Sequence, residues 1–456
     1  MNPRRLAVSA LVRVEEEDAF AQDLLERALE NPRLLAADRR LVAELVYGSI
    51  RHRLTLDTLL ERFSKTRLDR LDYPVLEILR TALYQIVFLD RIPPAAAVNE
   101  AVQLTKTMHF KSAGGFVNAV LRNAVRDIED RAAEKAAAVR RAVYRRAGSW
   151  CNFRSEILPS AEKSPAEFIA CAHSHPVWLV ERWLKRYGAE ETAALCRADN
   201  DVPVITVRVN SLKTTAADVL ARFTEAGVWA EPGNLPVSIR LPSHVRVDEL
   251  PGFAEGLFVV QDEGAMLVAP FLGVQPGQKV LDLCAAPGGK TTHLAEIMGD
   301  RGEITAMDLS AERVKMIEEN CRRLGLSCVR TVTADAARPE GLPEALRGTF
   351  DAVLLDAPCS NTGVLARRPE ARWRLDPEAI AECAARQGVL LRAALSAAKP
   401  GAAVVYSTCA IEPEENEAVV RAALAETQGL GLEEEKLLLP RASVGGGYMA
   451  RLRTKS

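Results

Sequence analysis

The sequence predicts a protein of three folded parts: an all-helical domain over residues 1–140, a small α+β module over 166–250, and an α/β domain with a parallel, doubly wound sheet over 251–456. The chain of 456 residues is too long for one ordinary hydrophobic core. Helical periodicity fills the first part, whereas apolar runs alternate with helical segments in the last. Residues 141–165 are interpreted as a linker.

Composition excludes several classes of protein. With 48% hydrophobic and 26% charged residues, the chain resembles neither a disordered nor a membrane-embedded protein. Its nine cysteines are widely spaced, without a CxxC pair or a Cys/His cluster at zinc spacing, so we expect neither a disulfide framework nor a metal site. Free thiols, the absence of a signal peptide and the absence of a long apolar stretch predict a cytoplasmic protein without a membrane partner.

The charge is unevenly distributed along the chain. Residues 1–150 contain 25 Lys and Arg against 20 Asp and Glu, which leaves 34 against 41 in the remainder. A mildly basic front part fits the binding of a polyanion, and an uneven but idle surface fits equally well.

The helical domain is predicted from periodic stretches such as residues 39–52 and 73–89, with Pro74 near a helix start and Pro93 and Pro94 between two helices. Periodicity then disappears over residues 146–165, which is the reason for the linker interpretation.

The α+β module is predicted from two helical stretches, 177–188 and 216–228, on either side of an alternating strand at 202–210. Five apolar runs follow, which we expect to form the parallel sheet: 279–283, 303–308, 329–335, 351–358 and 402–409.

The first strand-to-helix turn of the α/β domain has the composition of a cofactor site. The sequence LDLCAAPGGKTTHLAEIM (281–298) lets bare backbone at Gly288 and Gly289 approach a ligand beside a helix N-terminus. Asp308 ends the second strand, where a carboxylate can reach ribose hydroxyls, and Asp335 ends the third. The short APGGKT turn cannot wrap a triphosphate, which favours S-adenosylmethionine over NAD or ATP.

Two further strands each end in a cysteine. Cys359 follows the fourth strand in DAPCS, and Cys409 follows the fifth in YSTC. If these strands are neighbours, both thiols and the carboxylate of Asp356 open onto the crevice where open α/β sheets bind ligands. The alternative is that both cysteines are small buried hydrophobic residues.

A thiolate would allow a methyltransferase to methylate the C5 carbon of a pyrimidine, which is otherwise a poor nucleophile. Addition of the thiolate at C6 makes C5 reactive, and a base then removes the C5 proton so that the thiol is expelled. A carboxyl group at N3 stabilises the charge that builds up in the ring, and Asp356 is placed for this role.

These motifs resemble those of the RNA 5-methylcytosine methyltransferases. The similar runs are CAAPGGKTTH, DAPCSNTGVLARRPEARW and YSTCAIEPEENEAVV, together with Asp308 and Asp335. The domain order is similar to the RsmB (Sun, Fmu) type, whose members methylate a cytosine of bacterial 16S ribosomal RNA. The front part resembles the NusB RNA-binding fold, including AVNEAVQLTK (97–106), and the last part a Rossmann-like methyltransferase domain. Residues 148–165 match no family motif, and GGY near the end replaces a more aromatic run.

The resemblance implies a role for each matching residue. It implies covalent attack by Cys409, product release with the help of Cys359, and S-adenosylmethionine contact by a set of residues around the first turn: Cys284, Ala285, Ala286, Pro287, Gly288, Gly289, Lys290, Asp308, Asp335 and Asp356. It also implies 16S ribosomal RNA as the partner, and we expect a monomer. Glu414, Glu415 and Asn416 have the composition of a helix start.

An Arg-rich segment after Cys359 is the candidate RNA surface, with Arg367, Arg368, Arg372 and Trp373 suited to phosphate contacts and base stacking, or else forming a solvated loop. Two rival functions stay open. One is an RNA-binding adaptor with an inactive methyltransferase domain, and the other is methylation of an exocyclic amine, which needs no thiol.

Overall fold

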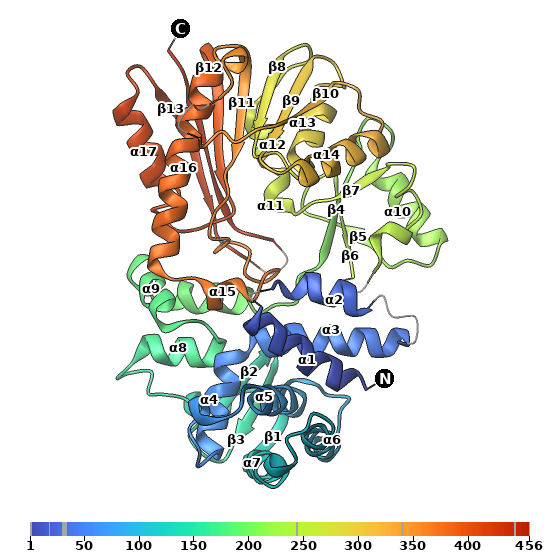
Figure 1. Cartoon of the computed structure of the whole chain (residues 1–456), viewed down its shortest axis with the longest axis vertical. Helices are drawn as coiled ribbons and strands as arrows, with labels where there is room; N and C mark the ends of the chain where they lie inside the picture. The colour runs from blue at the N-terminus through green and yellow to red at the C-terminus, as the bar shows by residue number, and fades with distance from the viewer. Residues whose placement is uncertain are drawn as a thin grey trace. The chain divides into compact units, whose positions relative to one another are not determined.

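The computed structural model describes residues 2–17, 19–29, 34–242, 245–338, 342–441 and 444–455. The chain forms two units (Figure 1). One comprises Met1–Asp201 together with Arg372–Arg374, and the other comprises Val202–Ala371 together with Leu375–Ser456.

The first unit is mainly helical, as predicted. Its central helix, α5, is buried all the way from Val75 to Phe88, because apolar residues occur on every side of it. The helices of this unit are α1 (Pro3–Glu16), α2 (Ala21–Leu29), α3 (Ala36–Arg51), α4 (Arg53–Phe63), α5 (Tyr73–Phe88), α6 (Pro94–Thr107), α7 (Gly114–Asp127), α8 (Pro165–His173) and α9 (Val177–Ala198), with short 3₁₀ turns at Leu68–Arg70, Lys111–Ala113 and Val139–Arg141.

The prediction of a linker over residues 141–165 is wrong for the first half of that range. Strands β1 (Ile128–Ala133), β2 (Ala142–Arg146) and β3 (Ser149–Phe153) form an antiparallel sheet in the order β1-β3-β2. Val143, Cys151 and Phe153 from this sheet are fully buried in the same core as the helices. Loss of helical periodicity therefore marked a change to strands, whose short alternation is hidden among alanines and arginines.

The predicted α+β module is divided between the two units. Helices α8 and α9 belong to the first unit, and the second begins at Val202. There, β4 (Ile205–Val209), β5 (Glu231–Pro232), β6 (Ser238–Leu241) and β7 (Phe258–Val260) form an antiparallel sheet in the order β5-β6-β4-β7. Helix α10 (Ala216–Glu225) begins with a capping box, in which Thr215 and Asp218 satisfy each other's backbone N–H groups.

The large sheet of the second unit has seven strands in the order β10-β9-β8-β11-β12-β14-β13. All five predicted apolar runs form strands, and these pair in parallel. The strands are β8 (Lys279–Leu283), β9 (Glu303–Asp308), β10 (Val329–Thr333), β11 (Phe350–Asp356) and β12 (Ala398–Thr408), followed by β13 (Gly431–Leu438) and β14 (Gly447–Arg453).

The last two strands correct the expectation of a wholly parallel sheet. β14 lies antiparallel to β12, and β13 lies antiparallel to β14. The mixed sheet arises because β13 and β14 are joined by a short connection, which permits only antiparallel pairing. The charged sequence of β13, largely exposed, carries none of the apolar pattern by which the other strands are predicted.

Helices cover both faces of the large sheet (Figure 1). Val353 and Leu355 of β11 face the core beneath α16 and α17, whereas Ala352 and Leu354 face the core beneath α12, α13 and α14. This alternation follows from the period of two along a strand. The remaining helices of the second unit are α11 (Glu263–Met266), α12 (Val268–Leu272), α13 (Gly289–Ile297), α14 (Ala311–Leu324), α16 (Pro377–Ala397) and α17 (Glu417–Glu426), with 3₁₀ turns at Val247–Glu249 and Glu344–Leu346. The short helix α15 (Ala371–Arg374) belongs to the first unit from Arg372 onward.

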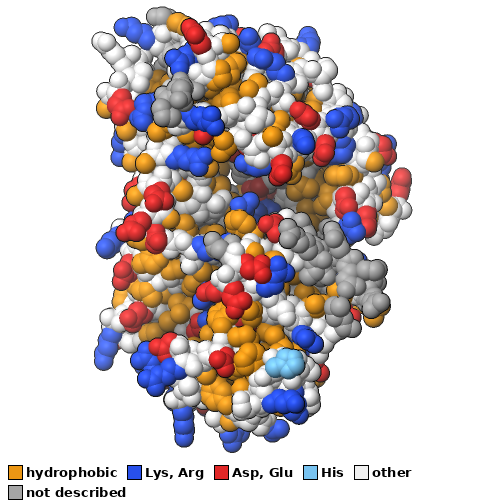
Figure 2. All heavy atoms as spheres, in the orientation of Figure 1, with side chains coloured by type: hydrophobic (Ala, Val, Ile, Leu, Met, Phe, Trp, Pro, Cys, Tyr) orange, Lys and Arg blue, Asp and Glu red, His pale blue; other side chains and the backbone are white. Residues whose placement is uncertain are grey.

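Basic and acidic side chains are interspersed over the face that Figure 2 shows, in keeping with the formal net charge of -2. Among the described residues, none of the helices combines the length and apolar character needed to cross a membrane.

Candidate functional site

The turn after β8 brings backbone close to the neighbouring helix. Cys284 has φ 63°, and Gly288, directly before α13, has φ 96°. A Cβ at position 288 would come within 3.2 Å of Ile317. Glycine therefore meets two demands here, a left-handed backbone and close packing against α14.

Asp308 holds this turn from the end of β9. Its carboxylate accepts the N–H groups of Ala286 at 3.1 Å and of Ser310 at 3.2 Å, and it lies 3.4 Å from the guanidinium of Arg313. Arg313 also donates to the carbonyl oxygen of Ala286 at 2.7 Å. The carboxylate is therefore fixed at a strand end, and it keeps acceptor capacity because an ionised carboxyl group has about four acceptor positions.

Asp335 lies two residues beyond β10 and accepts the N–H of Ala337 at 2.9 Å. Together with Asp308 and Asp356 it places a carboxylate after three different strands of the same sheet. This is the distribution expected of a site that binds hydroxyl and amine groups at the carboxyl ends of parallel strands.

Asp282 is a buried carboxyl group that the sequence analysis did not single out. It lies within β8, and its Oδ2 accepts the hydroxyl of Thr291 at 2.6 Å. Burial raises its pKa to about 7. Its Oδ1 has no hydrogen-bond partner among the described residues. The sequence signal was an acid within the otherwise apolar run VLDL, which is uncommon in a strand buried on both faces.

Asp356 forms an ion pair at the end of β11. Lys290 Nζ lies 2.5 Å from its Oδ2, and the hydroxyl of Ser407 donates to its Oδ1 at 2.9 Å. Asp356 and Ser407 are register partners on the neighbouring strands β11 and β12. Burial lowers the pKa of Lys290, but the charge and the hydrogen bond of Asp356 outweigh it, so the pKa is raised and the ammonium is retained.

The two cysteines meet, as predicted from the adjacency of their strands. Cys359 Sγ and Cys409 Sγ lie 3.1 Å apart. The hydrogen bond to Cys409, burial, and the negative charges nearby raise the pKa of Cys359 well above its usual value. Cys359 is therefore held as a neutral thiol, which suits a proton donor better than a nucleophile.

Asn361 bridges the two cysteines. It has φ 64°, its Oδ1 accepts from the thiol of Cys409 at 3.2 Å, and its Nδ2 donates to the carbonyl oxygen of Cys359 at 3.0 Å. No motif in the sequence indicates this residue, although asparagine is one of the few residues that tolerate positive φ.

Glu415 and Asn416 support the two cysteine loops, in contrast to the expected role in a first helical turn. The carboxylate of buried Glu415 accepts three hydrogen bonds. They come from the N–H of Ser360 at 2.9 Å, from the hydroxyl of Ser360, and from Nε2 of Gln387 at 2.9 Å. Asn416 accepts the hydroxyl of Thr408 at 2.6 Å and donates to the carbonyl of Ala410. Helix α17 begins only at Glu417.

The glycines near the C-terminus pack against the backbone that carries the cysteines. Gly446 N–H donates to the carbonyl of Gly363 at 2.7 Å, and Gly363 N–H donates to the carbonyl of Cys409 at 2.9 Å. A Cβ at Gly363 would come within 2.6 Å of Gly446 O, and one at Gly447 within 2.5 Å of Thr408 O. The GGY sequence is therefore explained by close backbone packing behind Cys409.

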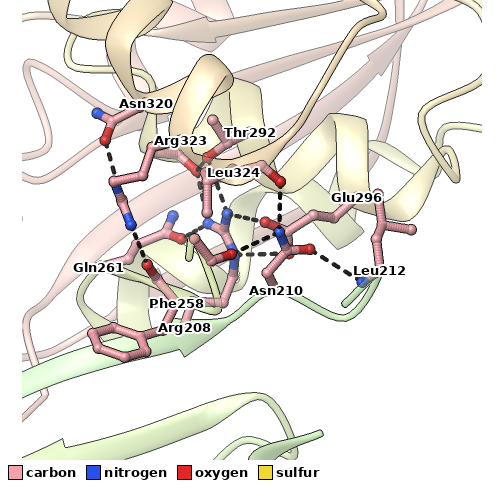
Figure 3. A network of polar contacts seen from close by, with 12 residues as sticks. Arg208, Asn210, Leu212, Phe258, Gln261, Thr292, Glu296, Asn320, Arg323 and Leu324 are labelled. Atoms are coloured by element: carbon pink, nitrogen blue, oxygen red, sulfur yellow. Dashed lines mark hydrogen bonds and ion pairs between the residues drawn. The ribbon is translucent and has the colours of Figure 1, made fainter. Parts of the chain in front are cut away.

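A buried network joins β4 to α13, the helix that follows the turn after β8 (Figure 3). Arg208, fully buried on β4, donates to Glu296 Oε1 at 2.8 Å, to Thr292 Oγ1 at 3.0 Å and to the carbonyl of Gly289 at 2.8 Å. Asn210 of the same segment donates to the carbonyl of Leu324 at 3.0 Å. The antiparallel module thus fixes the start of α13.

The four candidate RNA residues occupy different environments. Arg367 is ion-paired with Asp262, and Arg368 is exposed. Arg372 is fully buried in the first unit, whereas the half-buried Trp373 donates from Nε1 to the carbonyl of Ile50 at 2.9 Å.

Structural hydrogen bonds occupy the guanidinium of Arg372. It donates to the carbonyls of Ser174 at 3.0 Å and Asp199 at 2.9 Å, and to Oδ1 of Asn200 at 2.8 Å. A phosphate group cannot reach this guanidinium in the conformation described. Since phosphate contact requires an accessible cation, Arg372 is a structural residue in this conformation.

Within the part of the chain that the structure describes, there is no group of three or more His, Cys, Asp or Glu side chains arranged to hold a metal ion.

Three family models match successive parts of the chain. The NusB family matches residues 1–126, a ferredoxin-like domain of the RsmF/B-like methyltransferases matches 175–248, and the 16S rRNA methyltransferase RsmB/F matches 269–452. These matches follow the predicted order of a helical, a mixed and a catalytic part, and they identify the middle module as ferredoxin-like.

Individual relatives cover most of the chain. A probable ribosomal RNA small subunit methyltransferase B of Synechocystis sp. is 35% identical over 92% of this chain and 88% of the relative. The protein of the same name from Bacillus subtilis is 34% identical over 93% and 88%. A solved methyltransferase homolog protein from Pyrococcus horikoshii is 26% identical, with a TM-score of 0.56 over 65% of this chain and 100% of that one. Another solved structure, 26% identical, has a TM-score of 0.76 over 99% of both chains.

Proposed function

Since the chain belongs to the 16S rRNA methyltransferase RsmB/F family, we propose that it methylates C5 of a cytosine in small-subunit ribosomal RNA, with S-adenosylmethionine as methyl donor. The observation that carries this proposal is the pair of thiols, Cys359 and Cys409, 3.1 Å apart at the ends of neighbouring parallel strands. Methylation of an amine or of a hydroxyl group has no need of such a pair.

The residues around the first turn fit S-adenosylmethionine. The left-handed Gly288 lets backbone approach a ligand, and carboxylates are presented by Asp308 at the end of β9 and by Asp335 beyond β10. The buried Oδ1 of Asp282, without a partner among the described residues, is an acceptor suited to an ammonium or hydroxyl group. We assign cofactor contact to residues 284–290 with Asp308, Asp335 and Asp356. When bound there, S-adenosylmethionine supplies an electrophilic methyl group.

Cys409 is the proposed nucleophile. Its thiolate adds to C6 of the cytosine, a C6–S bond forms, and the C5=C6 double bond gives up its electron pair to make C5 reactive. After C5 is methylated, a base removes the C5 proton, the double bond returns and the C6–S bond breaks to release the thiolate.

Asp356 is proposed to face N3 of the base. The ion pair with Lys290 and the hydrogen bond from Ser407 hold its carboxylate in one position at the strand end. As the thiolate adds to C6, N3 takes up a proton from solvent, and a carboxylate fixed in this way accepts a hydrogen bond from the N3–H without having to reorganise during the reaction.

Cys359 is proposed to act in product release. Its raised pKa keeps the proton on its sulfur, directly beside the sulfur of Cys409. A thiol at this distance donates a hydrogen bond to the departing thiolate of Cys409 and stabilises it as the C6–S bond breaks.

The partners follow from the same family membership. The NusB-like helices over residues 1–126 are proposed to bind ribosomal RNA. We expect the protein to act as a monomer in the cytoplasm, and the target base to be unpaired or flipped out of its stack, because C5 and C6 are covered within a helix.

The test uses ribosomal RNA that carries 5-fluorocytosine. The fluorine at C5 cannot be removed as a proton, so the enzyme cannot complete the release step and the covalent complex persists. We expect the wild-type protein with S-adenosylmethionine to form a covalent protein–RNA complex that survives a denaturing gel, and Cys409→Ala to form none. With ordinary cytosine, Cys359→Ala should accumulate the complex because release is impaired. Cys171→Ala, a half-buried thiol of the first unit, serves as the matched control.

Three results would contradict the proposal. A complex that survives Cys409→Ala but is lost in Cys359→Ala would exchange the roles of the two thiols. Full methyl transfer by Cys409→Ala would favour an exocyclic amine as acceptor, and RNA binding without any methyl transfer by the wild type would favour the adaptor.

A further inference from the structure

The side chain of Asn361 contacts both cysteine segments through opposite ends of the same amide. Its Nδ2 donates to the carbonyl of Cys359 at 3.0 Å, and its Oδ1 accepts from the thiol of Cys409 at 3.2 Å. A carbonyl oxygen can only accept, so the NH₂ group must face Cys359. The amide oxygen therefore must face the sulfur of Cys409.

This orientation has a chemical consequence for Cys409. An amide oxygen is a favourable neighbour for a thiol, which can donate its proton, and an unfavourable one for a thiolate, which cannot. The same sulfur also contacts Cys359 Sγ at 3.1 Å, and because the proton of Cys409 is directed at Asn361, Cys359 must be the donor in this contact. The hydrogen bonds then run in one direction, from Cys359 to Cys409 to Asn361.

We propose that Asn361 is a positioning residue that holds Cys409 as a protonated, correctly aimed thiol until substrate binds. The inference rests on the proposed function, since it takes Cys409 as the nucleophile. A resting thiol is protected from oxidation and alkylation, whereas a resting thiolate is not. When the entering base displaces the Asn361 contact, the proton of Cys409 passes to solvent and the thiolate forms where it is needed.

Other charged and titratable groups also surround the thiol pair. Lys290 from α13 is near enough for the charge of Cys409 to raise its pKa, Asp356 is paired with that lysine, and Glu415 and Tyr406 lie on the side of Cys359. All of them are kept in the variants below, so a difference between the variants reports on Asn361 alone.

The experiment measures alkylation of Cys409 by iodoacetamide in the protein without RNA, from pH 6 to 10, with peptide mapping by mass spectrometry. Asn361→Gly removes the amide without backbone strain, because glycine accepts φ 64°. We expect alkylation of Cys409 at pH 7 to rise about three- to tenfold, the factor that one neutral hydrogen bond contributes. Asn361→Asp places a negative charge beside the sulfur and should shift the alkylation profile to higher pH.

Opposite shifts from the two variants are the decisive result. A merely structural role would move the profile of both variants in the same direction or of neither, and either outcome overturns the proposal. His109→Gly replaces a residue of φ 69° in the first unit and controls for the added glycine, and alkylation of Cys171 is the internal reference. Glycine and aspartate both tolerate positive φ, so both variants should fold, which their thermal unfolding would check.

Failure of this proposal is distinguishable from failure of the proposed function. The alkylation profile needs neither RNA nor methyl transfer. A wild-type complex with 5-fluorocytosine RNA together with unchanged alkylation in both Asn361 variants would reject the role of Asn361 and leave Cys409 as nucleophile.

Discussion

Asp282 shows how a single buried carboxyl group makes the stability of the second unit depend on pH. It lies in a strand covered on both faces, where the charged form is disfavoured, and its pKa is raised to about 7. Between pH 4 and 7 the folded state keeps a proton that the unfolded state has lost. The free energy of unfolding therefore falls as pH rises through this window and levels off above it.

Asp282→Asn should remove this part of the pH dependence. The amide stays uncharged and can still accept from Thr291, so the variant should gain stability relative to wild type by up to about 4 kcal/mol between pH 4 and 7.5, at about 1.36 kcal/mol per pKa unit. Urea unfolding at several pH values measures this difference. Asp351→Asn is the control of opposite sign, because Lys399 lowers the pKa of Asp351. Parallel stability profiles for wild type and Asp282→Asn would contradict the expectation.

At the scale of elements, the sequence predicted which residues lie at the strand ends. It did not predict which residues hold the loops after these strands in place. Neighbouring strands β11 and β12 bring Cys359 and Cys409 together because parallel strands end at the same edge of a sheet. Glu415 supports the loop of Cys359 from 55 residues away in sequence, a contact that no local pattern indicates.

The contact between β4 and α13 depends on a buried ion pair (Figure 3). Arg208→Met should lower the free energy of unfolding by about 3–5 kcal/mol, because it leaves Glu296 buried without its partner. It should also weaken S-adenosylmethionine binding, since Arg208 holds the carbonyl of Gly289 in the cofactor turn. Urea unfolding and calorimetric titration measure the two effects.

The double variant Arg208→Met with Glu296→Leu is the control for the ion pair. Replacing both charges by apolar groups should recover most of the lost stability, because no buried charge is left unpaired. A double variant as unstable as Arg208→Met would show that packing of the arginine stem, and not its charge, stabilises the contact.

At the scale of the whole molecule, residues 372–374 leave the second unit and belong to the first. Arg372 there meets Ser174, Asp199 and Asn200, about 170 to 200 positions away in sequence. A short Arg-rich segment predicted for RNA contact thus contributes a buried arginine to the core of another unit. The sequence does not distinguish an exposed arginine from a buried one. Burial decides whether the arginine can contact phosphate or forms hydrogen bonds within a core.

Arg372→Met tests which role holds. If Arg372 is a structural residue, its replacement should lower the free energy of unfolding of the first unit by about 2–4 kcal/mol, because buried carbonyls lose their donor. The salt dependence of RNA binding should stay the same. A phosphate contact would instead reduce the slope of log K against log salt by about one without loss of stability. Arg368→Met, at an exposed position, is the matched control for stability, which it should leave unchanged.

The sequence by itself determined the order of the parts, the five parallel strands and the chemistry at their ends. Strand periodicity, the turn at Gly288 and the positions of Asp356, Cys359 and Cys409 are local properties, and local properties can be read along a chain. It did not reveal the sheet over residues 128–153 or the antiparallel strands β13 and β14, and in β13 a run of charged residues hides the alternation. The tertiary structure alone decided which side chains meet: Lys290 with Asp356, Asn361 with both cysteines, and Arg372 with the core of the first unit. Such contacts depend on distances in the folded protein, and the separation of two residues along the sequence does not give these distances.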